Sequence, residues 1–406
     1  MAGVASQTAV GPIVPPLISA PPASARDPRP GLAGLAEADL AAWLSERGAP
    51  AYRARQLADH VWSAAAQSVD EMQTLPRALR TELDKSFRVT TLRDTEVRES
   101  DRGLTQKALH RLDDGRSIES VLMRYPARGC RRARATVCIS SQAGCAVGCP
   151  FCATGELGFW RDLEVAEILD QVRFWRHWLA GVGQRLTNVV FMGMGEPLLN
   201  VEPVLAAAAA ISDRARFGLG ARHITISTSG VVPGMERLIA ERPQYTLAVS
   251  LHAARPRLRD VLVPLNRRYP ATDVVDAAAR YAAATGRRVT YEYVMIEGIN
   301  DTVEEALAVA DLLRGQLAHV NLIPMNPVAH TPWQPSSLER TEAFATVLRA
   351  AGLETTVRRN RGIEIGAACG QLAAERQGEP PAAAVARRRE LLVIQSAGAL
   401  ARPSAR

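Results

Sequence analysis

The sequence has 406 residues, of which 47% are hydrophobic and 22% are charged, and its formal net charge is +7. This length and hydrophobic fraction support one large folded domain with an accessory domain, and they exclude a wholly disordered chain. No apolar run is long enough to cross a bilayer, and the apolar N-terminus is interrupted by prolines and lacks a basic segment. We therefore expect a cytoplasmic protein without a membrane partner, in which clustered cysteines bind metal or act in catalysis rather than form structural disulfides.

The excess positive charge comes in arginine clusters. The guanidinium group stays charged and binds phosphate through two hydrogen bonds, so such clusters favour a nucleic acid partner, although an ordinary solvated surface also explains them. The clusters are Arg128, Arg131, Arg132 and Arg134; Arg267 and Arg268; Arg287 and Arg288; Arg358, Arg359 and Arg361; and Arg387, Arg388 and Arg389.

The first part of the chain predicts three segments. Residues 1–30 are rich in Ala and Pro without periodicity, and we expect a disordered lead-in. Residues 31–95 show a helical pattern, with Gly48 ending one helix and Pro76 opening another, which predicts a small helical accessory domain and a candidate for RNA binding. Residues 96–130 alternate polar and apolar side chains between turn signals, which predicts an antiparallel β-ribbon extension.

Residues 131–375 repeat a strand, a loop and a helix six times. Mostly apolar strands separated by helices predict a parallel sheet covered on both faces. Right-handed crossovers would curl this sheet into a partial (β/α)6 barrel, an α/β fold whose functional loops follow the strands. Residues 376–406 predict a flexible basic tail. The expected strands are "ATVCIS", "TNVVFMG", "HITIST", "TLAVSL", "RRVTYEYVMI" and "HVNLIP".

Three cysteines cluster in the loop after the first of these strands. Cys145, Cys149 and Cys152 follow the spacing C-x3-C-x2-C. Three thiolates can hold three irons of a [4Fe–4S] cluster and leave the fourth iron open, and an open position is typical of a catalytic metal site. The alternative is a structural zinc site with a distant fourth ligand, such as Cys138, Cys369 or a histidine.

This loop, with Phe151 before its last cysteine, resembles the cluster loop of the radical S-adenosylmethionine (SAM) superfamily. The resemblance implies a partial barrel, one [4Fe–4S] cluster and SAM bound to its open iron. "GMGEPLLN" follows the second strand, where Glu196 resembles the residue that accepts hydrogen bonds from the SAM ammonium, and Gly195 permits close backbone approach.

Six motifs in order narrow the resemblance to the RlmN-type adenine-C2 RNA methyltransferases. They extend from about Glu119 to Leu372 and read "TVCISSQAGC", "GMGEPLLN", "ITISTSGVVPGM", "VSLHA", "NLIPMNP" and "AACGQL". The resemblance implies 23S ribosomal RNA as substrate, transfer RNA in some members, two SAM molecules per turnover, and an electron donor of the flavodoxin or ferredoxin type. We also expect a monomer.

The same resemblance assigns roles to single residues. Cys369 corresponds to the cysteine that carries a methyl group as an intermediate, and Cys138 to the thiol that resolves the RNA adduct through a transient disulfide. Glu119 corresponds to the proposed acceptor of the base proton, although Cys138 is an alternative acceptor. The implied SAM contacts, beside Gly195 and Glu196, are Ser227, Ser250, Leu251, His252 and Asn326.

Without the resemblance several of these residues have ordinary interpretations. Cys138 reads as a small buried strand residue, Glu119 as a solvent-facing carboxylate, and His252 as a strand-end histidine with a structural hydrogen bond. One segment departs from the family pattern, because "RGCRRARA" between Glu119 and Cys138 is longer and more basic than a plain turn. Cys130 in this segment has no family role, and the basic loop is a candidate RNA contact.

Two rival functions remain at this point. The sister activity that methylates carbon 8 of the same adenine shares the cluster and both catalytic cysteines, so those residues do not separate the two, although "GVVPGM", "AACGQL" and the N-terminal region favour carbon 2. A rival of another class is a non-catalytic RNA-binding protein stabilised by zinc.

Overall fold

A computed structural model describes residues 27–130, 132–358 and 360–373. The tail predicted for residues 376–406 and residues 1–26 of the predicted lead-in lie outside these ranges. Residues 27–30 lie within them and are hydrogen-bonded to the folded chain. The Arg88 side chain donates to the Arg29 carbonyl at 2.6 Å, and the Arg88 backbone NH donates to the Pro30 carbonyl at 3.0 Å. None of the helices in the described ranges combines the length and the apolar character that a bilayer span requires.

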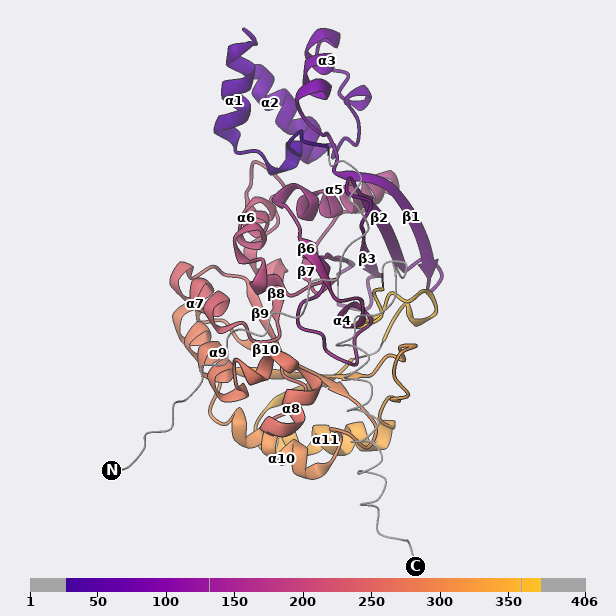
Figure 1. Ribbon diagram of the computed structural model, residues 1–406, viewed down its shortest axis with the longest axis vertical. Helices are drawn as coiled ribbons and strands as arrows, with labels where there is room; N and C mark the ends of the chain where they lie inside the picture. The colour runs from indigo at the N-terminus through magenta and orange to yellow at the C-terminus, as the bar shows by residue number, and fades with distance from the viewer. Residues whose placement is uncertain (1–26, 131, 359, 374–406) are drawn as a thin grey trace, which may run out of the picture.

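Among the residues that the structure describes, ten strands form one sheet in the order β1-β2-β3-β4-β7-β8-β9-β10-β11-β12 (Figure 1). The pairs from β1 to β4 are antiparallel and the pairs from β4 to β12 are parallel. The strands are β1 (Leu92–Ser100), β2 (Thr105–Leu112), β3 (Ser117–Tyr125), β4 (Arg134–Cys138), β7 (Asn188–Phe191), β8 (Ile224–Thr228), β9 (Thr246–Ser250), β10 (Val289–Met295), β11 (Ala318–Pro324) and β12 (Glu354–Val357).

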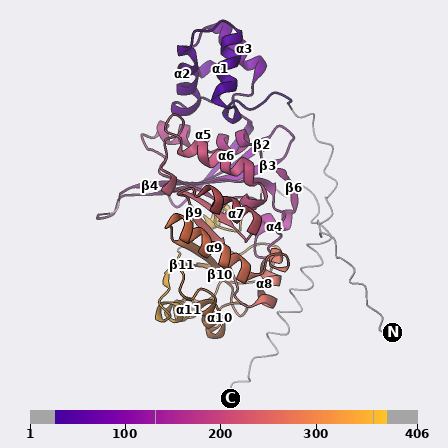
Figure 2. The ribbon, with the colours of Figure 1, turned by 90° about the vertical axis from the view of Figure 1, so that its left-hand side faces the viewer.

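The parallel part contains the six predicted strand–helix units. Helices lie over the sheet between successive strands, and buried strand side chains such as Val189, Phe191 and Tyr291 form one core with them (Figures 1 and 2). The arrangement confirms the α/β fold with a large parallel sheet. The helices are α5 (Val165–Gly181), α6 (Val201–Ser212), α7 (Val232–Glu241), α8 (Pro256–Leu262), α9 (Ala271–Thr285), α10 (Val303–Leu312) and α11 (Leu338–Ala350).

Two features differ from what the pattern suggests. The ribbon strands are part of the barrel's own sheet, because β3 pairs with β4 from Val121↔Cys138 to Tyr125↔Arg134. A further strand, β12, pairs with β11 at the far edge of the sheet and was not predicted. This strand has only four residues, "ETTV", and most of them are polar, so the sequence gives almost no hydrophobic signal for it.

The N-terminal helices form a separate group at the top of Figure 1. Gly48 has a positive φ just after the first helix, and the third begins directly after Pro76, as the sequence pattern predicts. The group comprises α1 (Glu37–Glu46), α2 (Tyr52–Ala58), a π-helical turn (Asp59–Ser63) and α3 (Arg77–Ser86). Leu57, Leu83 and Phe87 belong to the same core cluster as Trp175 of α5, so the helical group packs against the barrel.

Arg173 of α5 ties this helical group to the barrel. Its side chain has no solvent exposure, and it donates to the carbonyls of Val61 at 3.0 Å, Val89 at 2.8 Å and Ala66. It also forms an ion pair with Asp170, whose other oxygen accepts from the Thr91 backbone NH at 2.7 Å. A buried charge of this kind is tolerated only because every polar atom around it has a partner.

We expect Arg173→Met to loosen the helical group. The change leaves Asp170 buried without its cation, which costs about 3–5 kcal/mol. Trypsin should then cut between residues 31 and 91 at least about tenfold faster than in the unmodified protein. Arg185→Met, an exposed site near the end of α5, is the matched control and should change stability by less than about 0.5 kcal/mol. Equal cleavage rates in the two variants would contradict the role of Arg173.

Candidate active site

Two adjoining cavities lie where the parallel strands end. The larger has a volume of about 1010 Å³, including the part open to solvent, and the smaller about 560 Å³. Met192, Arg358 and Cys369 line both cavities. The carboxyl ends of parallel strands meet at one edge of such a fold, which explains why distant motifs converge here.

The cysteine loop forms one wall of the larger cavity. Cys145, Cys149 and Cys152 all line it, between β5 (Gln142–Gly144) and α4 (Ala153–Leu157). Gly144 has φ +77°, and a Cβ at this position would lie 1.9 Å from the Gly158 carbonyl oxygen. No other residue type could hold the loop this close to the opposite strand.

The three thiols fit an iron–sulfur cluster. Burial raises the pKa of Cys145 to about 12, with a further contribution from Cys152, and burial also raises the pKa values of Cys149 and Cys152. A bound metal cluster supplies the positive charge that would deprotonate such thiols. Within the described ranges, no three Cys, His, Asp or Glu side chains are gathered closely enough to hold a single metal ion. The cysteine ligands of a cubane cluster can lie farther apart than those of a single zinc ion, because each thiolate binds a different iron.

Glu196 connects two of the strand-end loops beside the cysteines. Its Oε2 accepts from the backbone NH of Ser229 at 2.7 Å and from the Ser229 hydroxyl at 2.8 Å. Burial raises its pKa, while these hydrogen bonds act in the opposite direction. The preceding Gly195 has φ +99°, and a Cβ there would lie 2.6 Å from the Gln142 Cβ. This carboxyl group lines the larger cavity and is suited to receive an ammonium group.

The other residues implied as SAM contacts divide into two groups. Ser227, Ser250, His252 and Asn326 line the larger cavity, whereas Leu251 is fully buried outside its lining. Asn326 is informative because its Oδ1 is buried without a hydrogen-bond partner, while its Nδ2 donates to the Cys369 carbonyl at 2.9 Å. An orphaned buried acceptor that lines a cavity indicates a missing hydrogen-bond donor, and a ligand supplies one.

His252 supports the cysteine loop. Burial lowers its pKa to about 3, so the ring is neutral near pH 7, and its Nδ1 accepts from the Val294 backbone NH at 3.1 Å. Its ring meets Phe151 edge to face at a centroid distance of 4.8 Å. Phe151 is the aromatic residue directly before Cys152, so the histidine packs against the loop that carries the thiols.

The loop that carries Cys369 is tied to three separate elements. Besides the Asn326 bond, the Gly370 carbonyl accepts from the Ala153 backbone NH at 2.7 Å, and the Leu372 carbonyl accepts from the Thr154 hydroxyl at 2.7 Å. The backbone NH of Ala373 donates to Glu119 Oε2 at 2.8 Å. These bonds hold Cys369 at the junction of the two cavities.

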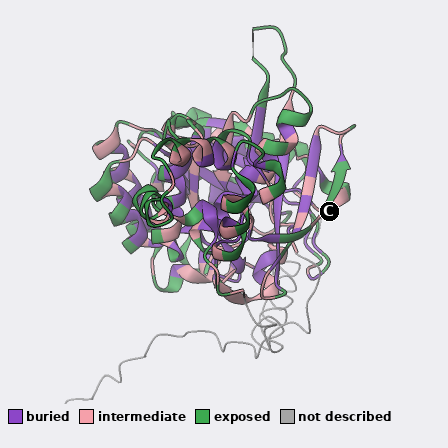
Figure 3. Ribbon diagram, turned by 90° about the horizontal axis from the view of Figure 1, so that it is seen from above, coloured by how far each residue is buried: buried purple, intermediate pink, exposed green. Residues whose placement is uncertain are grey.

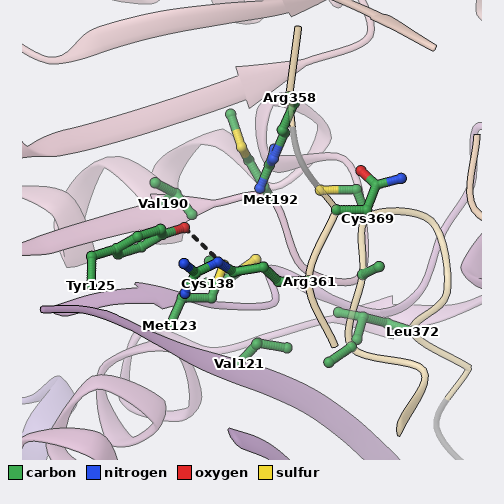
Figure 4. Close-up of a pocket in the computed structure, with 13 residues that line it drawn as sticks. Val121, Met123, Tyr125, Cys138, Val190, Met192, Arg358, Arg361, Cys369 and Leu372 are labelled. Carbon is green, nitrogen blue, oxygen red and sulfur yellow. Dashed lines mark hydrogen bonds between the residues drawn. The ribbon is translucent and has the colours of Figure 1, made fainter. Parts of the chain in front are cut away.

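The smaller cavity contains the second thiol. Cys138 faces it from β4, with Val121, Met123, Val190 and Met192 as an apolar wall (Figure 4). Burial raises the pKa of Cys138 to about 12, and the neighbouring Cys369 adds to this effect. Cys138 and Cys369 therefore line one cavity, and its apolar wall, which includes two methionine side chains, is suited to a planar, weakly polar group.

Glu119 lies beside this cavity and not in its lining. One carboxylate oxygen pairs with Lys107 Nζ at 2.8 Å and the other holds the Ala373 backbone NH. Its side chain is 5% exposed, so it is not the solvent-facing carboxylate that the strand pattern alone suggests.

Two charged residues of the larger cavity were missed by the sequence analysis. Arg358 follows β12 and lines both cavities, where the neighbouring Cys369 and Glu292 help to raise its pKa. It was counted only as part of an arginine cluster, because the strand before it was not recognised. Glu292 lies within β10, where its charge in the otherwise apolar strand "VTYEYVM" is a signal that could have identified it.

Comparisons with known proteins agree with this geometry. A family model described as the radical SAM superfamily matches residues 139–312, and one described as the ribosomal RNA large subunit methyltransferase N-terminal domain matches residues 31–89. A crystal structure of a radical SAM methyltransferase from Sphaerobacter thermophilus superimposes with a TM-score of 0.82 at 46% identity, covering 85% of this chain and 100% of that one.

Curated relatives match over nearly their whole length. A probable dual-specificity RNA methyltransferase RlmN of Parafrankia sp. (strain EAN1pec) is 48% identical over 374 residues, covering 89% of this chain and 94% of that protein. A protein of the same description from Gemmatimonas aurantiaca is 47% identical over 352 residues, covering 87% and 93%. This chain therefore belongs to the RlmN family of radical SAM methyltransferases, which use a [4Fe–4S] cluster and SAM.

Proposed function

We propose that this protein methylates carbon 2 of a specific adenine in the peptidyl-transferase region of 23S rRNA, and adenine in the anticodon loop of transfer RNAs. The observation that carries the proposal is the position of Cys369, which lines both the cavity of the three cysteines and the cavity of Cys138. One thiol can thus receive a carbon unit on one side and deliver it on the other. The similarity of residues 31–89 to a ribosomal RNA methyltransferase domain supports an RNA substrate.

Cys145, Cys149 and Cys152 would hold the cluster in the larger cavity. Gly195, Glu196, Ser227, Ser250, His252 and Asn326 would bind SAM beside it, with Leu251 behind the lining. When bound, the cluster and SAM supply a 5′-deoxyadenosyl radical. The carboxylate of Glu196 would receive the SAM ammonium, and the orphaned Oδ1 of Asn326 would accept a hydrogen bond from the ligand.

Carbon 2 of adenine is not a nucleophile and does not attack the SAM methyl group. We therefore assign the transfer of the carbon unit to the two remaining thiols, Cys369 and Cys138. Cys369 first accepts a methyl group from one SAM molecule, with release of its thiol proton. Loss of a hydrogen atom from this methyl group, in a reaction that uses a second SAM, leaves a methylene radical that adds to the base. The adduct would then lose the carbon 2 proton and one electron, which returns to the reducing system that supplied an electron for cleavage of the second SAM. Cys138 would attack the Cys369 sulfur as a thiolate and form a disulfide, and the carbon that leaves with the bonding electron pair would take up a proton to become the methyl group. A thiol reductant would reduce the disulfide before the next turnover.

Glu119 or Cys138 would take the proton that carbon 2 loses. Glu119 lies next to the Cys369 loop, bonded to Ala373, and Lys107 keeps a positive charge beside it. In this account the protein works as a monomer in the cytoplasm, and a flavodoxin or ferredoxin supplies electrons.

Iron content tests the cofactor assignment. After anaerobic reconstitution we expect about four irons and four sulfides per chain and a brown, oxygen-sensitive protein. Cys149→Ser should lose most of this iron, because the cluster then has two protein ligands. Cys130→Ser, at an exposed thiol, is the control and should keep it. A colourless protein with one zinc per chain would favour the zinc-stabilised RNA-binding alternative.

The resolving role of Cys138 predicts a trapped intermediate. Cys138→Ala removes the thiol that attacks Cys369, so the enzyme should remain covalently bound to RNA and migrate as a larger species on a denaturing gel. Cys369→Ala should form no adduct and no methylated RNA, and the double variant should resemble it. Multiple turnovers by Cys138→Ala would refute the assignment.

Mass-spectrometric mapping of the methylated adenine tests the position of the methyl group. We expect 2-methyladenine in a 23S rRNA fragment, and the same analysis of transfer RNA tests the second substrate. A product methylated only at carbon 8 would identify the protein as the sister enzyme.

A further inference from the structure

The hairpin between β3 and β4 projects from the body of the protein next to the smaller cavity. Figure 2 shows it extending away from the sheet beside β4, and its described residues belong to the exposed class that Figure 3 colours green. Its described residues between 126 and 134 are all exposed, they include Arg128, Arg132 and Arg134, and none is acidic. This is the longer, basic segment by which the chain departs from the family pattern.

The strands of this hairpin lead directly into the cavity. Tyr125, Met123 and Val121 alternate along β3 and all line it. Their partners across the ladder are Arg134, Thr136 and Cys138, respectively, so Arg134 and Cys138 lie on the same face of β4. Arg134 is four positions before Cys138 along the strand, which places its backbone about 13 Å from that of the resolving cysteine.

An aromatic ring held between two guanidinium groups lies at the base of the hairpin. The guanidinium carbon of Arg134 is 4.2 Å from the centre of the Tyr125 ring, and that of Arg361 is 4.4 Å from it. Arg361 also donates to the Arg124 carbonyl at 3.1 Å, and the Tyr125 hydroxyl contacts the Met123 sulfur at 3.7 Å (Figure 4). These contacts order Tyr125 and Arg361, which both line the cavity.

The arginines of the hairpin and Arg361 have no acidic partner within the part of the chain that the structure describes. Over those residues, Arg128, Arg132, Arg134 and Arg361 form no ion pair with a carboxylate. Exposed arginines on the helical side of the barrel behave differently, because each of the following contacts an acidic side chain: Arg280 with Glu236, Arg288 with Glu354, and Arg349 with Glu342. Exposed guanidinium groups without a carboxylate partner, on a hairpin whose strands line a cavity, are suited to phosphate.

We propose that the β3–β4 hairpin holds the RNA backbone next to the nucleotide whose base enters the smaller cavity. The inference rests on the proposed RNA substrate and adds the surface that positions it. Arg134 contacts a phosphate flanking the target nucleotide, at a distance from Cys138 that leaves room for the sugar and base between them. Arg128 and Arg132, farther out along the hairpin, contact phosphates beyond it. Tyr125 and Arg361 line the entrance through which the base passes.

The test measures binding of a 23S rRNA stem-loop from the peptidyl-transferase region by fluorescence anisotropy over a range of KCl concentrations. The triple variant Arg128→Gln, Arg132→Gln, Arg134→Gln should bind about tenfold to a hundredfold more weakly near 0.1 M salt. The slope of log affinity against log salt should fall by about 2, because each lost phosphate contact removes about 0.7 for single-stranded RNA. Iron content and melting temperature serve as the folding control.

The matched control removes the same charge from the helical side, with Arg280→Gln, Arg288→Gln and Arg349→Gln. It should leave affinity within about threefold and the salt slope nearly unchanged. Equal losses in both triple variants would show a general charge effect and overturn the proposal, as would full affinity in the hairpin variant. The proposal would also fail if RNA affinity stayed unchanged while reduction by a flavodoxin-type protein slowed, since the hairpin would then bind the electron donor.

Methylation of the same RNA by the unmodified enzyme is followed in parallel. If the unmodified enzyme methylates the RNA and the hairpin variant binds it normally, only the hairpin assignment is wrong. If the unmodified enzyme neither binds nor methylates any RNA, the proposed function itself fails and the hairpin assignment fails with it.

Discussion

The position of the Cys369 loop is the constraint on which the rest of the site depends. A single thiol must contact both the larger cavity and the smaller one, and the loop has little regular structure to hold it there. Hydrogen bonds from Asn326 after β11, from Ala153 and Thr154 in α4, and from Ala373 to Glu119 on β3 supply the order instead. Since these partners belong to three elements far apart in sequence, the barrel must be assembled before the site exists.

The two cavities are lined by different kinds of side chain, and the difference fits the separate roles proposed for them. The larger has the three clustered thiols and Cys369, two buried carboxyl groups and an orphaned amide oxygen, and so it offers ligands for metal and for a zwitterionic cosubstrate. The smaller is apolar around Cys138, and Arg358 and Arg361 also line it. Arg358 lines both of them, and its positive charge favours the ionised form of the buried Glu292, whose pKa burial raises.

The continuous core explains how the accessory helices and the ribbon support this arrangement. The ribbon strands extend the barrel sheet, so β3 presents Glu119 to the Cys369 loop and Val121 to the smaller cavity. The N-terminal helices pack on α5 through apolar contacts and through the buried Arg173 network. A displacement of these N-terminal helices would therefore also move α5. Gln171 of α5 donates to the carbonyl of Ser140, two residues after Cys138, at 3.0 Å.

The sequence by itself determined the periodic elements and the residues with distinctive chemistry. Apolar strands alternating with helices predicted the six-unit parallel fold, and the spacing of Cys145, Cys149 and Cys152 predicted three thiols at one site, because both signals are local. The tertiary structure alone decided which distant residues meet. It placed Arg358 and Glu292 in the cavities, engaged Glu119 with Lys107 and Ala373, and left Leu251 outside the lining. These outcomes depend on the register of strands and on the path of a loop after a short polar strand, and neither leaves a periodic pattern in the chain.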